Sequence, residues 1–320
     1  MKLAVIMSTF NGEKFLEEQI NSILNQNVDL ELYIHDDGST DHTLKILNKI
    51  SSENSNIHLF QIGKKMGVVK SFLNLLTATS ADYYMFSDQD DIWESDKATQ
   101  FIKKAQLLNS KVPGLVYSEL LLVDQSNTAL GETMASFYGW KDRESEQTVS
   151  KLLFSHRVTG ASMLINNAMK EFVVERLETL EYSSILMHDA FMAKIAMMVN
   201  NIIFLDQPLT RYRQHQNNAV GVSSKKTPFK RRADIFAAIY RETLYVYTLI
   251  VNSNLDITNQ DAKEMYKMMN KFFQTSYLRS GINLFLDQHF WRNISFKKRV
   301  FILIYKKRIY NSLGGNGDNG

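Results

Sequence analysis

In the segment Ser87-Asp88-Gln89-Asp90-Asp91-Ile92-Trp93, three carboxylates occupy four consecutive positions. The segment directly follows Tyr83-Tyr84-Met85-Phe86, a run of large apolar side chains that predicts a buried strand. Carboxylates so close together raise each other's pKa unless a cation neutralises them, and their oxygens suit a hard divalent ion such as Mg2+ or Mn2+. We therefore expect a metal and phosphate site at the carboxyl end of this strand. The alternative is a solvated acidic turn before a helix that starts near Ser95.

Strand and helix patterns alternate through the residues before this segment. Apolar strand patterns occupy residues 3–7, 32–35 and 57–62, and helices with one apolar face follow from Leu16, from Leu44 and over Val68–Thr77. This alternation predicts an α/β fold with a doubly wound, mostly parallel sheet. In such a sheet the ligand lies beyond the carboxyl ends of the strands.

Polar clusters lie at the predicted carboxyl ends of three of these strands. Asn11, Asp37 and Asp90 are far apart in the sequence, yet the expected topology brings their clusters to one edge of the sheet. This convergence favours the binding of a phosphate or a nucleotide, with Asp37 accepting hydrogen bonds from a base or a ribose. The alternative is that Asp36 and Asp37 cap the helix that follows them.

The composition excludes several classes of protein. The chain has 320 residues, of which 44% are hydrophobic and 22% charged, and this fits one domain of about 220 residues with an appendage. It contains no cysteine, so disulfides and thiolate chemistry are excluded. No G-x-x-x-x-G-K-[ST] motif occurs, and no G-x-G-x-x-G follows the first strand, which disfavours P-loop and dinucleotide-binding folds. The opening apolar run is too short for a signal peptide, and no window approaches the roughly 20 apolar residues of a membrane span, so we expect a cytoplasmic location.

Three segments together carry a family resemblance. They are Met7-Ser8-Thr9-Phe10-Asn11-Gly12-Glu13, Asp36-Asp37-Gly38-Ser39-Thr40-Asp41 and Asp88-Gln89-Asp90-Asp91-Ile92-Trp93. In this order and spacing they closely resemble the nucleotide-sugar half of family 2 glycosyltransferases, which have the GT-A fold. Within that family the chain looks most like bacterial rhamnosyltransferases of cell-wall and capsule assembly. That likeness rests on the opening segment and on Arg211-Tyr212-Arg213-Gln214-His215-Gln216-Asn217-Asn218-Ala219-Val220-Gly221, and the matches extend over residues 1–222.

The resemblance implies roles for the residues that match the family. It implies that one set of residues binds the nucleotide-sugar: Ser8, Phe10, Asn11, Glu13, Asp37, Lys70, Asp88, Gly160, Arg211 and Arg213. It implies Asp90 as the primary ligand of Mn2+ or Mg2+, and His215 as a second group at the metal or diphosphate. The arginines suit a diphosphate leaving group, because fixed cations stabilise its growing negative charge. Gly160 interrupts a β-like pattern, which indicates close approach of the backbone to a ligand or else a β-bulge.

His188 and Asp189 open a further predicted helix with an apolar face. An aspartate at a helix start is usually a cap or a partner of the helix dipole. The position matches the family's catalytic acidic residue, so the resemblance implies that Asp189 is the general base that removes the proton of the acceptor hydroxyl. His188 is expected either to hydrogen-bond the acceptor or to orient Asp189. Trp140 lies in a polar, irregular segment and is expected either to line the acceptor cleft or to pack in a loop.

The character of the chain changes after Val222. Residues 225–232 contain five cations, which indicates a domain boundary, and helical patterns follow over residues 235–250 and 265–273. Residues 288–317 contain no acidic side chain and mix cations with aromatics, a composition that favours an anionic membrane surface. A solvated basic helix is the alternative, and no recognition motif supports nucleic acid. We therefore expect a catalytic domain over residues 1–222, a basic helical region over residues 223–313 that associates with the membrane, and a disordered tail over residues 314–320.

The resemblance implies an inverting, metal-dependent glycosyltransferase. Its expected donor is dTDP-rhamnose, and its expected acceptor is a lipid-linked saccharide at the inner face of the membrane. A UDP-hexose transferase of the same family is the first alternative. A non-catalytic module that binds sugars or membranes is an alternative of another class. A nucleotidyltransferase is disfavoured, because residues 8–13 contain one glycine and no cation where such enzymes carry a glycine-rich basic loop.

Overall fold

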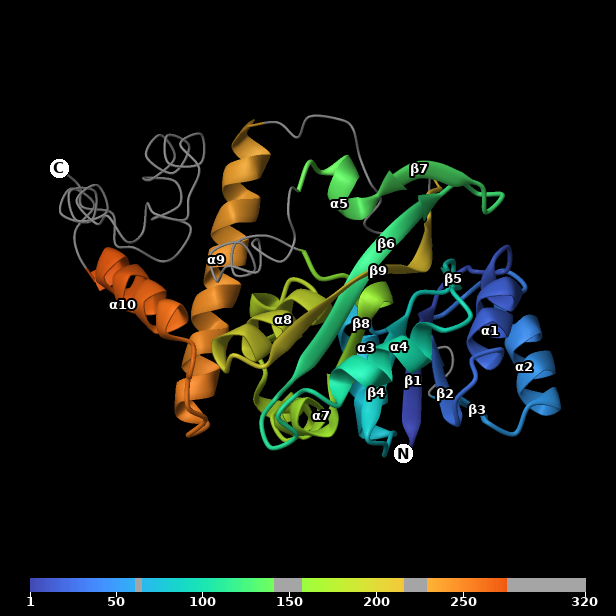
Figure 1. Ribbon diagram of the computed structural model, residues 1–320, viewed down its shortest axis with the longest axis horizontal. Coiled ribbons are helices and arrows are strands. Elements are labelled where there is room, and N and C mark those ends of the chain that lie inside the picture. Colours follow the sequence, from blue (N-terminus) through green and yellow to red (C-terminus); the bar gives the residue numbers. More distant parts are fainter. Residues whose placement is uncertain (61–64, 141–156, 216–228, 275–320) are drawn as a thin grey trace. The chain divides into compact units, whose positions relative to one another are not determined.

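The computed structural model describes residues 1–60, 65–140, 157–215 and 229–274 (Figure 1). The chain divides into two compact units. The first comprises Met1–Glu146, Val158–Ala196 and Asn201–Val222, and the second comprises Gln147–Arg157, Met197–Asn200 and Ser223–Gly320. The first unit contains the sheet and every residue for which the sequence predicts a role in binding or catalysis.

The N-terminal half of the first unit has the predicted alternation of strands and helices. Its elements are β1 (Leu3–Thr9), α1 (Leu16–Leu24), β2 (Leu30–Asp36), α2 (Thr43–Glu53), β3 (Ile57–Leu59), α3 (Val68–Thr77) and β4 (Tyr83–Ser87). Strand β1 pairs in parallel with β2 and β4, with Thr9 opposite Asp36 and Met7 opposite Ser87. The carboxyl ends of these strands therefore lie side by side, as the sequence predicts. Strand β3 ends at Leu59, so it is shorter than the predicted strand 57–62, of which residues 61 and 62 lie outside the described residues.

The second half of this unit extends the sheet with a different pattern. Its elements are β5 (Ile92–Trp93), α4 (Lys97–Ala105), β6 (Leu115–Val123), β7 (Ala129–Thr133), α5 (Met134–Phe137), the 3-10 turns η1 (Gly160–Ser162), η2 (Leu177–Thr179) and η3 (Tyr182–Ser184), β8 (Met163–Asn166), α7 (Asn167–Val174), α8 (His188–Met198) and β9 (Ile202–Arg213). The strand order is β3-β2-β1-β4-β8-β6-β9-β5, and β7 pairs with β6.

Antiparallel pairing distinguishes this half from the first. Strand β8 runs antiparallel between β4 and β6, and β5 runs antiparallel to β9, whereas β6 and β9 are parallel. Figure 1 shows β6 and β9 as two long strands side by side. The sheet is therefore mixed rather than parallel throughout, because β8 separates the two parallel groups. Gly160 lies in a 3-10 turn just before β8, so the interruption of the β-like pattern there is a helical turn and not a bulge.

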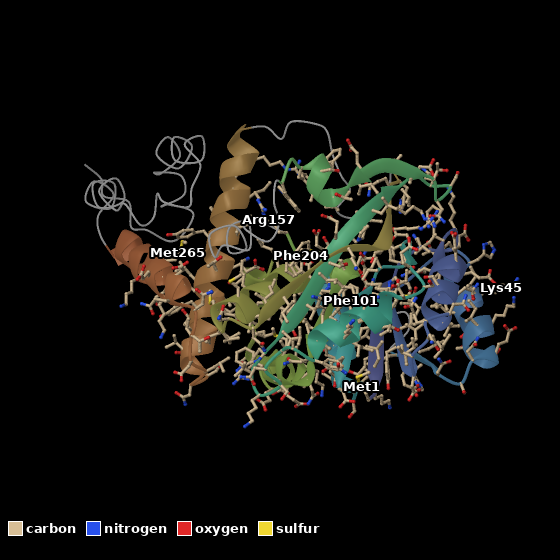
Figure 2. The ribbon with its side chains drawn as sticks, viewed as in Figure 1. Met1, Lys45, Phe101, Arg157, Phe204 and Met265 are labelled. Carbon is tan, nitrogen blue, oxygen red and sulfur yellow. The ribbon has the colours of Figure 1, made fainter. Side chains whose placement is uncertain are left out.

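Helices pack against the sheet through the apolar faces that the sequence shows. Leu16, Ile20 and Ile23 of α1 are fully buried at the spacing of one helix face. Phe101 of α4, labelled in Figure 2, is also fully buried and belongs to the same apolar core as Val5 and Met85 of the sheet. Burial of such side chains typically contributes about 1.5–3 kcal/mol each, so this core fixes the strands whose ends carry the site.

The described part of the second unit consists mainly of two helices. Helix α9 (Phe229–Asn252) contains the predicted helical pattern 235–250, and α10 (Gln260–Gln274) contains the pattern 265–273. Tyr247 of α9 stacks on Tyr266 of α10. No helix within the described ranges is long and apolar enough to cross a membrane. The predicted membrane-associating segment 288–317 and the tail 314–320 lie outside the described residues.

Candidate active site

The loop after β1 and the loop after β2 are joined by hydrogen bonds at the sheet edge. Buried Asp36 accepts from Thr9 Oγ1 at 3.0 Å and from Ser39 N at 2.9 Å. Asn11 has a left-handed backbone, with φ of 49°, and its Oδ1 accepts from Thr40 N at 2.8 Å. Asp36 therefore stabilises the turn after β2, and it does not cap helix α2, which begins only at Thr43.

Asp37 and Glu13 have backbone partners at this edge. The carboxylate of Asp37 accepts from the backbone N–H groups of Met66 and Gly67, the latter at 3.0 Å. Its Oδ1 lies 3.6 Å from His35 Nε2, which has no hydrogen-bond partner among the described residues. Glu13 Oε2 accepts from His42 N at 2.8 Å, and these hydrogen bonds to His42 lower the pKa of Glu13. Both carboxylates thus order the loops of the predicted nucleotide pocket.

Phe10 has an exposed ring beside these loops. Its side chain is 46% exposed, and Lys65 Nζ lies 5.6 Å from the ring centroid. Its backbone N–H donates to Gln89 Oε1 at 2.8 Å and its carbonyl accepts from Gln89 Nε2 at 2.9 Å. A Cβ at Gly12 would lie 2.3 Å from the same Oε1 atom, so a larger residue there would displace the Gln89 side chain from these bonds. Gln89 therefore joins the first loop to the acidic segment.

Two further residues of the N-terminal half are predicted to bind the nucleotide-sugar. They are Ser8 on β1 and Lys70 on α3. Ser8 is partly buried near the end of β1, one residue before Thr9. Lys70 of α3 is exposed, and its Nζ lies 4.9 Å from the ring centroid of Tyr182. Their roles toward a ligand stay predictions.

The acidic segment forms a turn after β4 with three differently placed carboxylates. Asp88 is partly buried, and desolvation together with the charges of Asp90 and Asp189 raises its pKa to about 7. Asp90 Oδ2 lies 2.7 Å from His215 Nε2. Asp91 is fully buried, and its Oδ1 accepts from Arg213 N at 3.1 Å. Burial and the two neighbouring aspartates raise the pKa of Asp91, whose Oδ2 has no hydrogen-bond partner within the described part of the chain.

The two arginines of β9 differ in burial and in partners. Arg213 is 1% exposed, and its guanidinium donates to Asp90 O at 2.8 Å, to Gln125 O at 2.6 Å and to Glu18 Oε2 at 2.7 Å. Arg211 donates through Nε to Glu94 Oε1 at 2.8 Å, and its side chain is 37% exposed. Arg213 therefore supports the acidic turn, and contact of either arginine with a diphosphate stays a prediction.

Asp189 lies in the first turn of α8. It is 7% exposed, its Oδ2 accepts from Gly160 N at 2.9 Å, and its Oδ1 accepts from Ala190 N at 2.6 Å. Its charge raises the pKa of Asp88, which places the two carboxylates in one electrostatic environment. The sequence separates them by more than 100 positions, and the fold brings them together.

His188 is buried beside Asp189 and Gly160. Its ring stacks on Phe72 with a centroid distance of 4.1 Å, and a Cβ at Gly160 would lie 2.8 Å from its Nε2. Neither ring nitrogen has a hydrogen-bond partner among the described residues, and burial lowers the pKa of His188. The imidazole therefore packs as a neutral aromatic ring, and its predicted contact with an acceptor stays untested.

Trp140 packs beside an exposed tyrosine. Its ring stacks on Tyr138 with a centroid distance of 5.2 Å, and it packs against the apolar cluster that contains Leu120 and Tyr212. Tyr138 is 47% exposed. The two stacked rings thus form one aromatic surface, which the contact of Trp140 with the apolar cluster holds in place. This arrangement is compatible both with the predicted acceptor cleft and with loop packing.

Lys97 is a residue of this site that the sequence does not single out. It is the first residue of α4 and is fully buried, with Nζ donating to Ala161 O at 2.7 Å. Burial lowers its pKa, and the charges of Asp91 and Asp88 oppose that shift. A lysine in the first turn opposes the helix dipole, and this was the signal available in the sequence.

The side chains at the acidic turn are of types that can bind a hard divalent cation. Within the described residues no group of three or more His, Asp or Glu side chains surrounds one point. The side chains of Asp90 and His215 are both largely buried and lie in contact, and Asp88 is beside them. Mg2+ is usually bound by one or two carboxylates together with substrate phosphates, so two protein ligands suffice for this type of site.

Known sequences are similar to this chain over part or most of its length. Residues 4–117 match the model of the family described as Glycosyl transferase family 2. The chain is 28% identical to the dTDP-rhamnosyl transferase RfbG of Shigella flexneri, over 93% of this chain and 98% of the relative. It is 34% identical to the GalNAc(5)-diNAcBac-PP-undecaprenol beta-1,3-glucosyltransferase of Campylobacter jejuni, over 32% of this chain and 34% of the relative.

Solved structures share the fold. TarS residues 1–349 of S. aureus, in complex with UDP-GlcNAc, align with a TM-score of 0.56 and 17% identity over 98% of this chain and 89% of that chain. A mannosyltransferase from Pyrobaculum calidifontis, in complex with GDP-Man and Mn2+, aligns with a TM-score of 0.54 and 15% identity over 97% and 87%. The protein is therefore a glycosyltransferase with the GT-A fold. Residues 4–117 match the glycosyl transferase family 2 domain, and the chain is similar to a dTDP-rhamnosyl transferase over most of its length.

Proposed function

We propose that this protein is an inverting, metal-dependent glycosyltransferase that moves rhamnose from dTDP-rhamnose to a hydroxyl group of a lipid-linked saccharide. The observation that carries the proposal is the position of Asp189, a buried carboxylate fixed by Gly160 N–H and close enough to the acidic turn for its charge to raise the pKa of Asp88. A sugar bound through its diphosphate at Asp90 would therefore have a candidate base nearby.

Asp189 acts as the general base in this mechanism. It takes the proton of the acceptor hydroxyl as that oxygen attacks the anomeric carbon, and one direct displacement inverts the configuration at that carbon. Positioned bases contribute on the order of 100- to 10,000-fold in rate. Gly160 N–H holds the carboxylate in one orientation, so little reorganisation is needed before the proton moves.

Asp90 and His215 are the groups that would hold Mn2+ or Mg2+, and the bound ion would stabilise the negative charge of the departing diphosphate. Arg213 keeps Asp90 in place through its bond to the Asp90 carbonyl. The nucleotide would lie over the loops of Asn11 and Asp37, with the exposed ring of Phe10 beside it.

The likeness to a dTDP-rhamnosyl transferase along nearly its full length favours rhamnose as the transferred sugar. A UDP-hexose is the second candidate donor. A glucosyltransferase relative and a structural neighbour with bound UDP-GlcNAc favour it, although each likeness is shorter or more distant. The membrane-facing acceptor rests on the basic, aromatic composition of residues 288–317 and on a relative whose name includes an undecaprenol-linked saccharide.

A donor screen tests the proposal. The purified protein is heated with Mn2+ and a panel of UDP-, GDP- and dTDP-sugars, and a ligand at 100 times its Kd should stabilise the fold by about 2.7 kcal/mol. We expect a metal-dependent rise in Tm with dTDP-rhamnose and slow release of dTDP by hydrolysis. A rise with UDP-hexoses alone would transfer the assignment to the second candidate, and liposome flotation without binding to anionic lipid would remove the membrane component.

A further inference from the structure

Lys97 has a buried amino group that contacts Trp93, at the end of the acidic segment. Its side chain is fully buried, and its Nζ lies 3.9 Å from the ring centroid of Trp93. Burying an ammonium group is unfavourable unless charges and hydrogen bonds compensate for the lost water. Asp91 and Asp88 supply the opposite charges, and Asp91 is itself fully buried. A side chain with no exposed surface has no solvent-facing role, so its contacts inside the protein define what it does.

The ammonium group also bonds to the turn that holds the base. Lys97 Nζ donates to Ala161 O at 2.7 Å, and Thr210 Oγ1 donates to the same carbonyl at 3.1 Å. Ala161 lies in η1, whose first residue, Gly160, donates its N–H to Asp189 Oδ2 at 2.9 Å. A continuous series of contacts therefore runs from Trp93, at the end of the acidic segment, through Lys97 and η1 to Asp189.

We propose that Lys97 is a positioning residue that fixes the distance between the acidic turn and the general base Asp189. Its Nζ packs on Trp93 of the acidic segment on one side, and its hydrogen bond holds η1 on the other. This inference rests on the proposed function of Asp189 and deepens it. Displacement of a catalytic group by about 1 Å can lower a rate 100-fold, so a residue that sets this distance affects turnover while leaving donor binding intact.

The test uses Lys97→Met, which introduces an unbranched side chain one atom shorter and removes both the charge and the donor. Replacing a buried charge by an apolar side chain of similar volume is often tolerated in folding. Lys97→Gln keeps a hydrogen-bond donor for Ala161 O. Lys103→Met is the matched control, because Lys103 lies on the same helix and is exposed. The full-length protein, with Mn2+ and the sugar nucleotide that gives the largest Tm shift for the wild type, is used throughout.

We expect Lys97→Met to lower the rate of nucleotide release from the donor about 100-fold, with the donor's KM within about threefold of the wild type. Lys97→Gln should recover part of this loss, and Lys103→Met should match the wild type. In a double variant with Asp189→Asn, Lys97→Met should add no further loss, since both changes act on the same base.

Several results would overturn the proposal. A folded Lys97→Met protein with an unchanged rate would show that Lys97 does not set the geometry. A raised KM with an unchanged rate would indicate that it acts on the donor instead. Additive losses in the double variant would separate Lys97 from Asp189, and misfolding of both Lys97 variants would make it a folding residue. Failure of the proposed function looks different, because the wild type itself would then release no nucleotide.

Discussion

The two halves of the catalytic unit contrast in how they build the site. In the N-terminal half, parallel strands β1, β2 and β4 end side by side, and the residues that follow each strand meet through short local loops. In the second half, the candidate site residues come from three separate elements, with Gly160 in η1, Asp189 in α8 and Arg213 in β9. The N-terminal half can therefore be predicted from local patterns, whereas the second half depends on contacts between distant segments.

The largest expected effect comes from the second half, in Asp189→Asn. Asparagine keeps an oxygen that can accept from Gly160 N–H, and it removes the negative charge, the acceptor for Ala190 N–H and the ability to take a proton. We expect the transfer rate to fall on the order of 100- to 10,000-fold, with donor binding retained. Nucleotide release and product formation measure the effect. Asp206→Asn serves as the control because Asp206 is exposed on β9.

The next effect tests whether the two halves share one metal site. Either Asp90→Asn or His215→Gln should lower the metal-activated rate on the order of 100-fold and weaken the response to added Mn2+, because the two side chains are in contact. EDTA should abolish the donor-induced Tm shift of the wild type. If the rate falls with Asp90→Asn but not with His215→Gln, His215 is not part of the metal site. The control is Asp29→Asn, at an exposed position, which should leave the rate unchanged.

A smaller effect concerns stability and compares the two arginines of β9. Arg213→Met removes a buried guanidinium that donates to Asp90 O, Gln125 O and Glu18 Oε2, the last in the N-terminal half, and should lower the free energy of unfolding by about 2 kcal/mol. Arg211→Met should cost less than about 1 kcal/mol, because its pair with Glu94 is partly exposed. Urea unfolding measures both changes. Equal losses would contradict the view that Arg213 joins the halves.

The smallest effect is a pH dependence at His188. Burial lowers its pKa in the folded protein below the ordinary value of 6.5, so the unfolded chain binds a proton more readily. The wild type should therefore lose stability as the pH falls below this value, relative to His188→Gln, by up to about 1 kcal/mol between about pH 7.5 and about pH 5.5. Parallel urea titrations would show no such divergence if the imidazole were charged in the folded protein.

The sequence predicts the elements of the N-terminal half well because each depends on a local pattern of apolar and polar residues. Helix α3 spans the predicted Val68–Thr77, and the clusters of Asn11, Asp37 and Asp90 lie at strand ends as expected. The family resemblance supplied the candidate base Asp189, which a helix cap would otherwise explain. Local periodicity does not give strand order, so the antiparallel insertion of β8 became visible only in the structure.

Side-chain partners were the least predictable part of the site. Lys97 was passed over because a lysine in a helix is ordinarily exposed, and its burial depends on Asp91, Trp93 and Ala161 from three different segments. Glu13 and Asp36 looked like ligand contacts or caps, and the structure shows that they bond to neighbouring loops. Such partners are set by tertiary packing, which a single sequence does not display.

The reach of Arg213 limits how this enzyme can be recombined with its relatives. The family match ends at residue 117, so a chimera joined at that residue would exchange the whole matched domain with that of a relative. Arg213 lies beyond that junction, yet its guanidinium packs 4.6 Å from the ring centroid of Phe15 and bonds to Glu18 on α1. A transplanted module would have to bring its own matching arginine strand, so the natural unit of exchange extends from β1 to the end of β9.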